Sequence, residues 1–160
     1  FAADYASGNI ESFKVNADAF MSLIGDMDRL LATRDEFLLG NWLESAKAMG
    51  DTPEESKLYE KNARNLLGTW GNKDCKLFDY ACKQWSGMMN GYYKQRWSLF
   101  FEDVLANWGH YDQKEFAEKC KDYEWDWISD TTCFPTETIG DEIEVVKSIW
   151  NKYSSDLLND

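Results

Sequence analysis

The chain has 160 residues and a formal net charge of −12 at pH 7, from 17 basic and 29 acidic side chains. A surface this acidic repels phosphate backbones and anionic membranes, so the composition argues against nucleic acid and membrane partners. Hydrophobic residues make up 44% of the chain, yet no apolar run approaches the ~20 residues that span a bilayer, which indicates one folded globular domain. Since the chain begins at Phe1 without methionine or an apolar leader, we interpret it as a piece cut from a longer protein.

Two helices are predicted in the first fifty residues. Apolar residues recur at spacings of three and four from Phe13 to Leu31, which is the stripe of one long amphipathic helix. The segment Thr33-Arg-Asp-Glu36 has the form of a capping box, so we expect a second helix to begin there. The inward face of that helix would carry Phe37 and Trp42.

Two further helices are predicted around a central loop. The segment Thr52-Pro53-Glu-Glu55 places threonine at the N-cap and proline at the first helical position, which predicts a helix ending near Trp70. After the loop, apolar spacing predicts a long central helix of about thirty residues from Leu77 to Trp108. Gly87 and Gly91, four residues apart, would leave a smooth groove on that helix.

Two final helices complete the predicted fold. Asp112-Gln-Lys-Glu115 is expected to cap a fifth helix, and Gly140-Asp141 to open a sixth, with a loop containing Pro135 between them. The sequence has no alternating strand pattern, internal repeat or low-complexity linker. It therefore predicts a single all-α domain over residues 1–160, a bundle of about six helices that includes one long central helix.

The loop between the third and fourth helices has the composition of a ligand-binding wall. Aromatic rings mixed with polar groups around an exposed loop suit a pocket that stacks on a ligand and hydrogen-bonds it. Trp70 would offer its ring face to a pyranose, and Tyr80 would add a ring and a hydroxyl. Asp79 and Lys83 would pair at helical spacing, and Gln84 would orient the loop. A packing role at this corner is the alternative, and the residue pattern alone favours it.

Aromatic residues elsewhere have structural interpretations. Tyr92 and Arg96 stand at i and i+4, where a cation–π contact would hold helices together. The run Tyr123-Glu-Trp-Asp-Trp127 places rings on more than one face of a helix. We expect such a helix to be covered by another domain, which would leave Trp125 and Trp127 exposed in this chain alone.

The side chains that bind metals or act as nucleophiles form no coherent motif. Cys75, Cys82, Cys120 and Cys133 show no Cys-x-x-Cys spacing and accompany the single His110, so we expect no metal site and no cofactor. Four thiols either form two disulfides or remain free, and the spacing leaves both states open.

Three motifs of this sequence resemble the C-terminal helical region of the α-N-acetylglucosaminidases, family 89 of the glycoside hydrolases. The first is Phe37-Leu-Leu-Gly40-Asn-Trp42-Leu-Glu44. The second joins Thr69-Trp70-Gly71 to Asp79-Tyr80-Ala-Cys-Lys83-Gln84-Trp85, and the third is Tyr92-Tyr93-Lys-Gln-Arg96-Trp97. A weaker match runs from Gly140 to Tyr153. The loop before Asp79 is about one residue longer than in relatives, and Cys82 stands where relatives usually have asparagine.

The resemblance implies an enzyme whose catalytic residues lie outside this chain. Members of the family remove terminal α-linked N-acetylglucosamine from glycans, with retention of configuration, by means of two glutamates on a (β/α)-barrel that precedes the helical domain. The chain has no barrel pattern, so we expect no catalytic residue here, an inactive isolated domain, and the barrel of the same polypeptide as its partner. The resemblance places Trp70, Leu77 and Tyr80 in the wall of the sugar pocket, and Asp79, Lys83 and Gln84 in support.

The same resemblance implies a location and leaves one rival interpretation. A bacterial member would be secreted, periplasmic or on the cell surface, and an animal member lysosomal. The rival is a free-standing helical module that binds carbohydrate or protein without any attached enzyme. The length of the parent open reading frame distinguishes the two.

Overall fold

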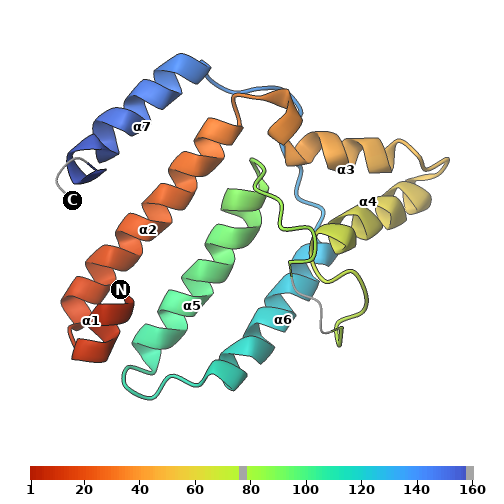
Figure 1. Ribbon diagram of the computed structural model, residues 1–160. Helices are drawn as coiled ribbons and strands as arrows, with labels where there is room; N and C mark the ends of the chain where they lie inside the picture. The colour runs from red at the N-terminus through yellow and green to blue at the C-terminus, as the bar shows by residue number, and fades with distance from the viewer. Residues whose placement is uncertain (76–78, 158–160) are drawn as a thin grey trace.

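The computed structural model describes residues 1–75 and 79–157, and these form seven α-helices without any strand longer than a single bridge (Figure 1). The α-helices are α1 (Ala2–Ser7), α2 (Ile10–Leu31), α3 (Leu39–Lys47), α4 (Pro53–Leu67), α5 (Lys94–Ala106), α6 (Gln113–Ser129) and α7 (Glu142–Leu157). A 3₁₀ turn, η1 (Asp35–Phe37), precedes α3, and a π-helical segment, η2 (Met89–Tyr93), leads directly into α5. The predicted all-α class is confirmed, and α1 is a short helix that the sequence analysis did not predict.

Three long helices, α2, α5 and α6, make up the centre of the molecule. α5 packs against both α2 and α6, α4 contacts α6, and α3 forms a hairpin with α4 (Figure 1). The last helix, α7, contacts α2 and lies on the opposite side of the molecule from the α3–α4 hairpin (Figure 1). The segment between α4 and α5 therefore stands at the end of the central helices, where it is free to form a site.

Aromatic rings fill the space between α1, α2 and α5. We call this the aromatic core; its members are Phe1, Phe13, Phe20, Trp97 and Phe101. The ring centroids of Phe13 and Phe101 lie 5.8 Å apart at an interplanar angle of 77°, and those of Phe20 and Trp97 lie 4.8 Å apart at 71°. Edge-to-face packing of this kind places the positive edge of one ring against the negative face of the next.

The helix starts that depend on local capping are confirmed. The Thr52 hydroxyl accepts a hydrogen bond from the amide of Glu55, whose carboxylate in turn accepts one from the Thr52 amide. The Asp112 carboxylate accepts from the first amides of α6, and the Asp141 carboxylate accepts from the amide of Glu144 at 3.0 Å. Each bond satisfies an amide that the first helical turn leaves unpaired.

The second helix does not begin at Thr33, and that prediction was wrong. The Thr33 hydroxyl instead donates to the carbonyl of Leu30 at 2.8 Å, at the end of α2. The chain then makes η1 and pairs with a distant segment, because the Ser86 amide donates to the Phe37 carbonyl at 2.8 Å. α3 begins only after this pairing, and Phe37 and Trp42 are partly exposed instead of facing inward.

The long helix expected from Leu77 to Trp108 starts later and ends earlier than predicted. Helical structure begins at Met88, runs through η2 and ends at Ala106. Gly87, with φ of +91°, adopts the left-handed conformation just before it. The buried Asp28 of α2 acts as the cap, because its carboxylate accepts from the amides of Gly87 and Asn90 at 2.7 and 3.0 Å. A side chain from another helix thus sets the start of this one.

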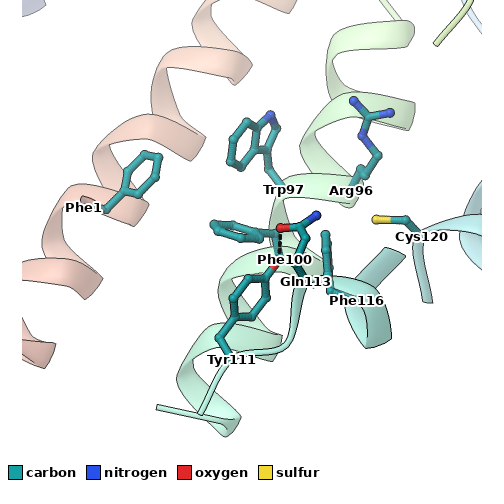
Figure 2. A pocket seen from close by; sticks show the side chains of 8 residues that line it. All are labelled: Phe1, Arg96, Trp97, Phe100, Tyr111, Gln113, Phe116 and Cys120. Carbon is teal, nitrogen blue, oxygen red and sulfur yellow. Dashed lines mark hydrogen bonds between the residues drawn. The ribbon is translucent and has the colours of Figure 1, made fainter. Parts of the chain in front are cut away.

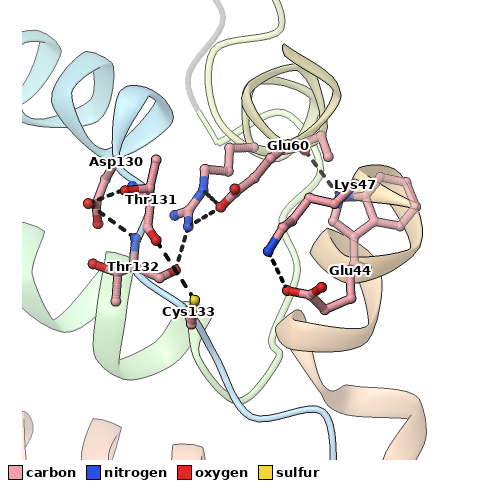
Figure 3. A network of polar contacts seen from close by, with 10 residues as sticks. Glu44, Lys47, Glu60, Asp130, Thr131, Thr132 and Cys133 are labelled. Atoms are coloured by element: carbon pink, nitrogen blue, oxygen red, sulfur yellow. Dashed lines mark hydrogen bonds and ion pairs between the residues drawn. The ribbon is translucent and has the colours of Figure 1, made fainter. Parts of the chain in front are cut away.

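The groove predicted at Gly87 and Gly91 receives the ring of Phe134. A Cβ atom built on Gly91 would lie 2.9 Å from Phe134 Cε1, so only glycine permits this approach. The same loop is held from the other side by the fully buried guanidinium of Arg64, which donates to Glu60 at 2.8 Å and to the Thr132 carbonyl at 2.7 Å (Figure 3). The loop between α6 and α7 is therefore fastened across the middle of the molecule.

The expectation that Trp125 and Trp127 would both be exposed was wrong. Trp127 is buried, and its ring lies 4.8 Å from that of Tyr92, while Trp125 is half-buried beneath the ammonium group of Lys61. Two faces of α6 are occupied because α4 and α5 both contact it. Packing within this chain covers the rings that the sequence analysis assigned to another domain.

The four thiols, whose state the spacing left open, are all free in the structure. Over the described residues, no helix combines the length and apolar character needed to cross a membrane.

Candidate functional site

The candidate site begins where α4 ends, in a turn organised by Asn65. The Asn65 carbonyl accepts a hydrogen bond from the Trp70 amide at 2.7 Å. Its side-chain oxygen accepts from the Thr69 hydroxyl at 2.8 Å and from the Gly71 amide at 3.2 Å. These bonds turn the chain sharply out of the helix and leave Trp70 at the surface, with φ of +47°.

The second half of the loop places Tyr80 against Trp70. The Tyr80 amide donates to the carbonyl of Gly68 at 3.0 Å, so the loop is closed on the end of α4. The two rings stack with centroids 4.2 Å apart and an interplanar angle of 29°. Trp70 is 48% exposed and Tyr80 50%. We call this pair the aromatic platform. The two residues lie together, as the sequence analysis expected of a wall, but each covers one face of the other.

Asp79 directs its carboxylate toward Tyr93, the last residue of η2. Its Oδ1 accepts a hydrogen bond from the hydroxyl of Tyr93. Burial of Tyr93, together with this bond, raises the pKa of its phenol above the ordinary value, so the hydroxyl remains a donor through the neutral range. The sequence analysis gave a structural role to the neighbouring Tyr92, and no local pattern links Tyr93 to a residue fourteen positions earlier.

Lys83 and Gln84 make local contacts. The Lys83 ammonium lies 5.5 Å from the ring centroid of Trp85, and among the described residues no ion pair joins it to Asp79, so the expected pairing is not formed. The Gln84 amide donates to Cys82 Sγ at 3.5 Å and borders a crevice of about 210 Å³ between α2 and α5. Leu77, the remaining residue assigned to the wall, lies outside the described residues.

The loop holds backbone strain. Trp70, Asp79 and Cys82 have φ of +47°, +49° and +46°, and they are the non-glycine residues with positive φ in the described part of the chain. For residues other than glycine such conformations cost of order 1 kcal/mol or more and persist only where surrounding contacts hold them. Trp70 belongs to the platform, and Asp79 and Cys82 lie on either side of Tyr80, so the non-glycine backbone strain of the described chain is concentrated in this loop.

A second concave region lies between α5 and α6 (Figure 2). It has a volume of about 280 Å³ and is bordered mainly by rings, among them Phe100, Tyr111 and Phe116. These rings pack edge to face on one another, and the nearby guanidinium of Arg96 is already paired with Glu124 at 2.9 Å. Arg96 also lies 5.5 Å from the Tyr92 ring centroid, the cation–π contact that the sequence predicted. The region belongs to the packing of the helices.

Metal-binding groups do not gather in any part of the chain that the structure describes. No three His, Cys, Asp or Glu side chains lie together in a way that would hold an ion. The single His110 is exposed at the end of α5, away from the platform. What the loop offers chemically is an exposed aromatic face, a phenol hydroxyl and neighbouring polar groups.

Comparison with known proteins gives one consistent result. A family profile described as the alpha-N-acetylglucosaminidase (NAGLU) C-terminal domain matches residues 1–152. Human alpha-N-acetylglucosaminidase is similar to this chain, with 34% identity over 134 residues that cover 82% of the chain.

Solved structures agree with the sequence comparison. A family 89 glycoside hydrolase from Clostridium perfringens in complex with 2-acetamido-1,2-dideoxynojirmycin superimposes over 95% of the chain, with 32% identity and a TM-score of 0.80. The complex of a Clostridium perfringens family 89 enzyme with PUGNAc covers 99%, at 31% identity and a TM-score of 0.84. The chain spans only 18% of the human protein and 18% and 19% of the two bacterial chains.

Proposed function

The chain belongs to the family of alpha-N-acetylglucosaminidase C-terminal domains, and from this premise we propose that it is the helical domain of a longer enzyme that removes terminal α-linked N-acetylglucosamine from glycans. In that enzyme the aromatic platform walls the pocket that holds the terminal sugar. The catalytic glutamates belong to the barrel domain of the same polypeptide, so the 160 residues alone release no sugar. We also propose that the parent enzyme acts outside the cytoplasm. A bacterial parent would be secreted, periplasmic or on the cell surface, and an animal parent would be lysosomal.

The aromatic platform carries this proposal. A pyranose presents C–H groups on one face and hydroxyls around its rim, and an exposed indole or phenol ring complements both. Because Trp70 and Tyr80 stack on each other, the pair presents a rigid outer face at little cost in side-chain entropy. The bacterial relative was solved with a ligand that carries a 2-acetamido group, as N-acetylglucosamine does. A sugar of that kind fits the chemistry of the platform.

Exposed apolar residues on α4 support the association with a barrel domain. Leu58 and Leu66 are exposed, and at eight residues apart they lie on one side of the helix, where they form an apolar stripe. Leu66 stands in the last turn of α4, just before the turn that leads to Trp70. We propose that this stripe packs on the barrel and directs the platform toward its pocket. It replaces the surface on α6 that the sequence analysis favoured.

The test is Trp70→Ala in the full-length parent enzyme. Loss of the ring removes stacking area at the sugar, and we expect kcat/KM to fall by about 5- to 150-fold, equivalent to roughly 1–3 kcal/mol. The melting temperature should change little, because the ring is half-exposed. Trp150→Ala is the matched control, since Trp150 is 55% exposed on α7, far from the loop. Unchanged kinetics for Trp70→Ala with a collapsed melting temperature would assign Trp70 to packing instead.

A free-standing binding module remains the rival, and it makes opposite predictions. It requires a parent reading frame without several hundred residues of barrel pattern, and it requires the 160-residue chain to bind its ligand alone. Measurable release of N-acetylglucosamine by the 160 residues, lost on substitution of one of their own carboxylates, would contradict both interpretations.

A further inference from the structure

One side chain of η2 reaches the loop residue that precedes Tyr80. Asp79 is covalently next to Tyr80, and its carboxylate accepts the hydrogen bond from the Tyr93 hydroxyl. On the basis of the function proposed above, we propose that Tyr93 is a positioning residue. Its hydroxyl holds Asp79 in the left-handed conformation and thereby aims the Tyr80 ring at Trp70.

The backbone around Tyr80 needs such an anchor. Asp79 adopts φ of +49°, a conformation that aspartate tolerates better than most residues but that still costs energy. On the far side, the Tyr80 amide is bound to the carbonyl of Gly68. Two further backbone bonds hold the segment, from the Ala81 amide to the Leu67 carbonyl at 3.5 Å and from the Cys82 amide to the Asp79 carbonyl at 3.1 Å. The Tyr93 bond is the one that holds the Asp79 side chain, and its loss should let Asp79 shift toward ordinary φ values and rotate the Tyr80 ring relative to Trp70.

The π-helical segment η2 makes the anchor rigid. A π turn shifts the hydrogen-bond pattern by one residue, and such turns recur at functional sites. Here the Tyr123 hydroxyl lies within hydrogen-bond distance of the carbonyls of Gly91 and Tyr92, at 3.1 and 3.0 Å, and its single proton is shared between them. Tyr123 thus ties α6 to the backbone of the π segment. Tyr93, the last residue of η2, is 8% exposed, so its phenol is held by packing at the point where Asp79 arrives.

The neighbouring tyrosine provides a matched comparison. Tyr92 occupies the same π segment, is fully buried and contacts the Tyr93 ring edge to face at 5.2 Å. Its hydroxyl, in contrast, is buried near the carboxylate of Glu124 on α6 and makes no hydrogen bond to the described residues of the loop. Tyr92→Phe and Tyr93→Phe therefore remove the same atom from adjacent positions, and only the second removes a bond to the loop.

The experiment reads the platform directly in the 160-residue chain. With ¹⁵N-labelled tryptophan, NMR resolves the indole N–H resonances of the eight tryptophans. The Trp70 resonance is assigned by its loss in Trp70→Phe, and its shift depends on the stacked Tyr80 ring. We expect Tyr93→Phe to move this resonance more than any other, and Tyr92→Phe to leave it in place. A Trp70 resonance unchanged in Tyr93→Phe, whatever the melting temperature does, would overturn the positioning role.

Substitutions of Asp79 supply the reciprocal test. Asp79→Asn keeps an acceptor oxygen and a residue type that tolerates positive φ, so the Trp70 resonance should stay near its original position. Asp79→Ala removes both properties and should reproduce the shift seen in Tyr93→Phe. If Asp79→Asn and Asp79→Ala behave alike, the hydrogen bond is not what positions the platform.

Kinetics of the parent enzyme separate this inference from the proposed function. We expect Tyr93→Phe to lower kcat/KM by roughly 2- to 10-fold, the range for one lost hydrogen bond, with Tyr92→Phe unchanged. If Trp70→Ala leaves kcat/KM unaltered while Tyr93→Phe still moves the Trp70 resonance, the sugar-facing function fails and the positioning role stands. If Trp70→Ala impairs catalysis while the Trp70 resonance does not move in Tyr93→Phe, the sugar-facing function stands and the positioning role fails.

Discussion

The aromatic core and the aromatic platform use the same side chains in opposite ways. In the core, most rings meet edge to face, as Phe1 and Phe101 do at 82°, and the one stacked pair, Trp97 and Phe101 at 29°, is covered by the rings around it. In the platform, Trp70 and Tyr80 stack nearly in parallel on a non-helical loop and stay half-exposed. Edge-to-face clusters occupy both faces of their rings, whereas a two-ring stack leaves an outer face free. The backbone that carries a ring, more than the ring itself, therefore decides whether the ring is buried among others or left half-exposed at the surface.

The largest loss of stability is expected from a substitution in the aromatic core. Phe101→Ala leaves a cavity at a site that is 5% exposed and contacts several rings, so we expect the free energy of unfolding to fall by about 3–5 kcal/mol. Urea titration followed by far-ultraviolet circular dichroism measures it. Under the same conditions, Trp70→Ala should cost less than about 1 kcal/mol. Equal losses from the two variants would erase the distinction between core and platform.

An intermediate effect is expected where the two regions meet, at the start of helical structure before α5. Asp28→Ala removes the carboxylate that accepts from the Gly87 and Asn90 amides, and unpaired buried amides should lower stability by about 1–3 kcal/mol. Hydrogen exchange measured by mass spectrometry should increase at residues 86–90 while α2 remains protected. Asp28→Asn, which keeps one acceptor oxygen, is the milder control. Uniform exchange over the whole chain would instead indicate that the helix start is not a separate unit.

The smallest effect uses the cysteines as reporters of the two regions. Cys82 is exposed in the platform loop, while Cys120 is half-buried beside the rings between α5 and α6 (Figure 2). Burial raises the pKa of the Cys120 thiol to about 11. Since only the thiolate reacts, iodoacetamide at pH 8 should alkylate Cys82 well before Cys120, and the rate at Cys120 should keep rising toward pH 11. Peptide mapping at timed intervals tests the order, and equal rates at pH 8 would contradict it.

Features that depend on neighbours in the sequence were predictable. Thr52, Asp112 and Asp141 cap helices because a side chain satisfies an amide two or three residues later, which the sequence displays directly. The start of helical structure before α5 was not predictable, because Asp28 caps it from a different helix, 59 residues before Gly87. The apparent capping box at Thr33 failed because pairing of Phe37 with Ser86 competes for the following backbone.

Some features of the candidate site were likewise predictable from the sequence, and others were not. Its location between the third and fourth predicted helices, and the choice of Trp70 and Tyr80, came from composition and family resemblance, and their contact with a sugar stays a prediction. The separation of Asp79 from Lys83 and the hydrogen bond from Tyr93 depend on the tertiary structure. Helical spacing was assumed for residues 79–83, whereas the loop takes up positive φ at Asp79 and Cys82 and sends neighbouring side chains in different directions.

The sequence by itself determined the all-α class, the family, and the caps at Thr52, Asp112 and Asp141, because apolar periodicity and capping act within a few residues. Only the tertiary structure decided that Trp127 is buried, that Trp70 stacks on Tyr80, and that Tyr93 holds Asp79. These outcomes depend on which helices pack together and on hydrogen bonds between residues ten or more positions apart. No local pattern encodes such contacts, because the same set of helices can pack in several arrangements. The arrangements differ in which helices touch and in the course of the loops that connect them.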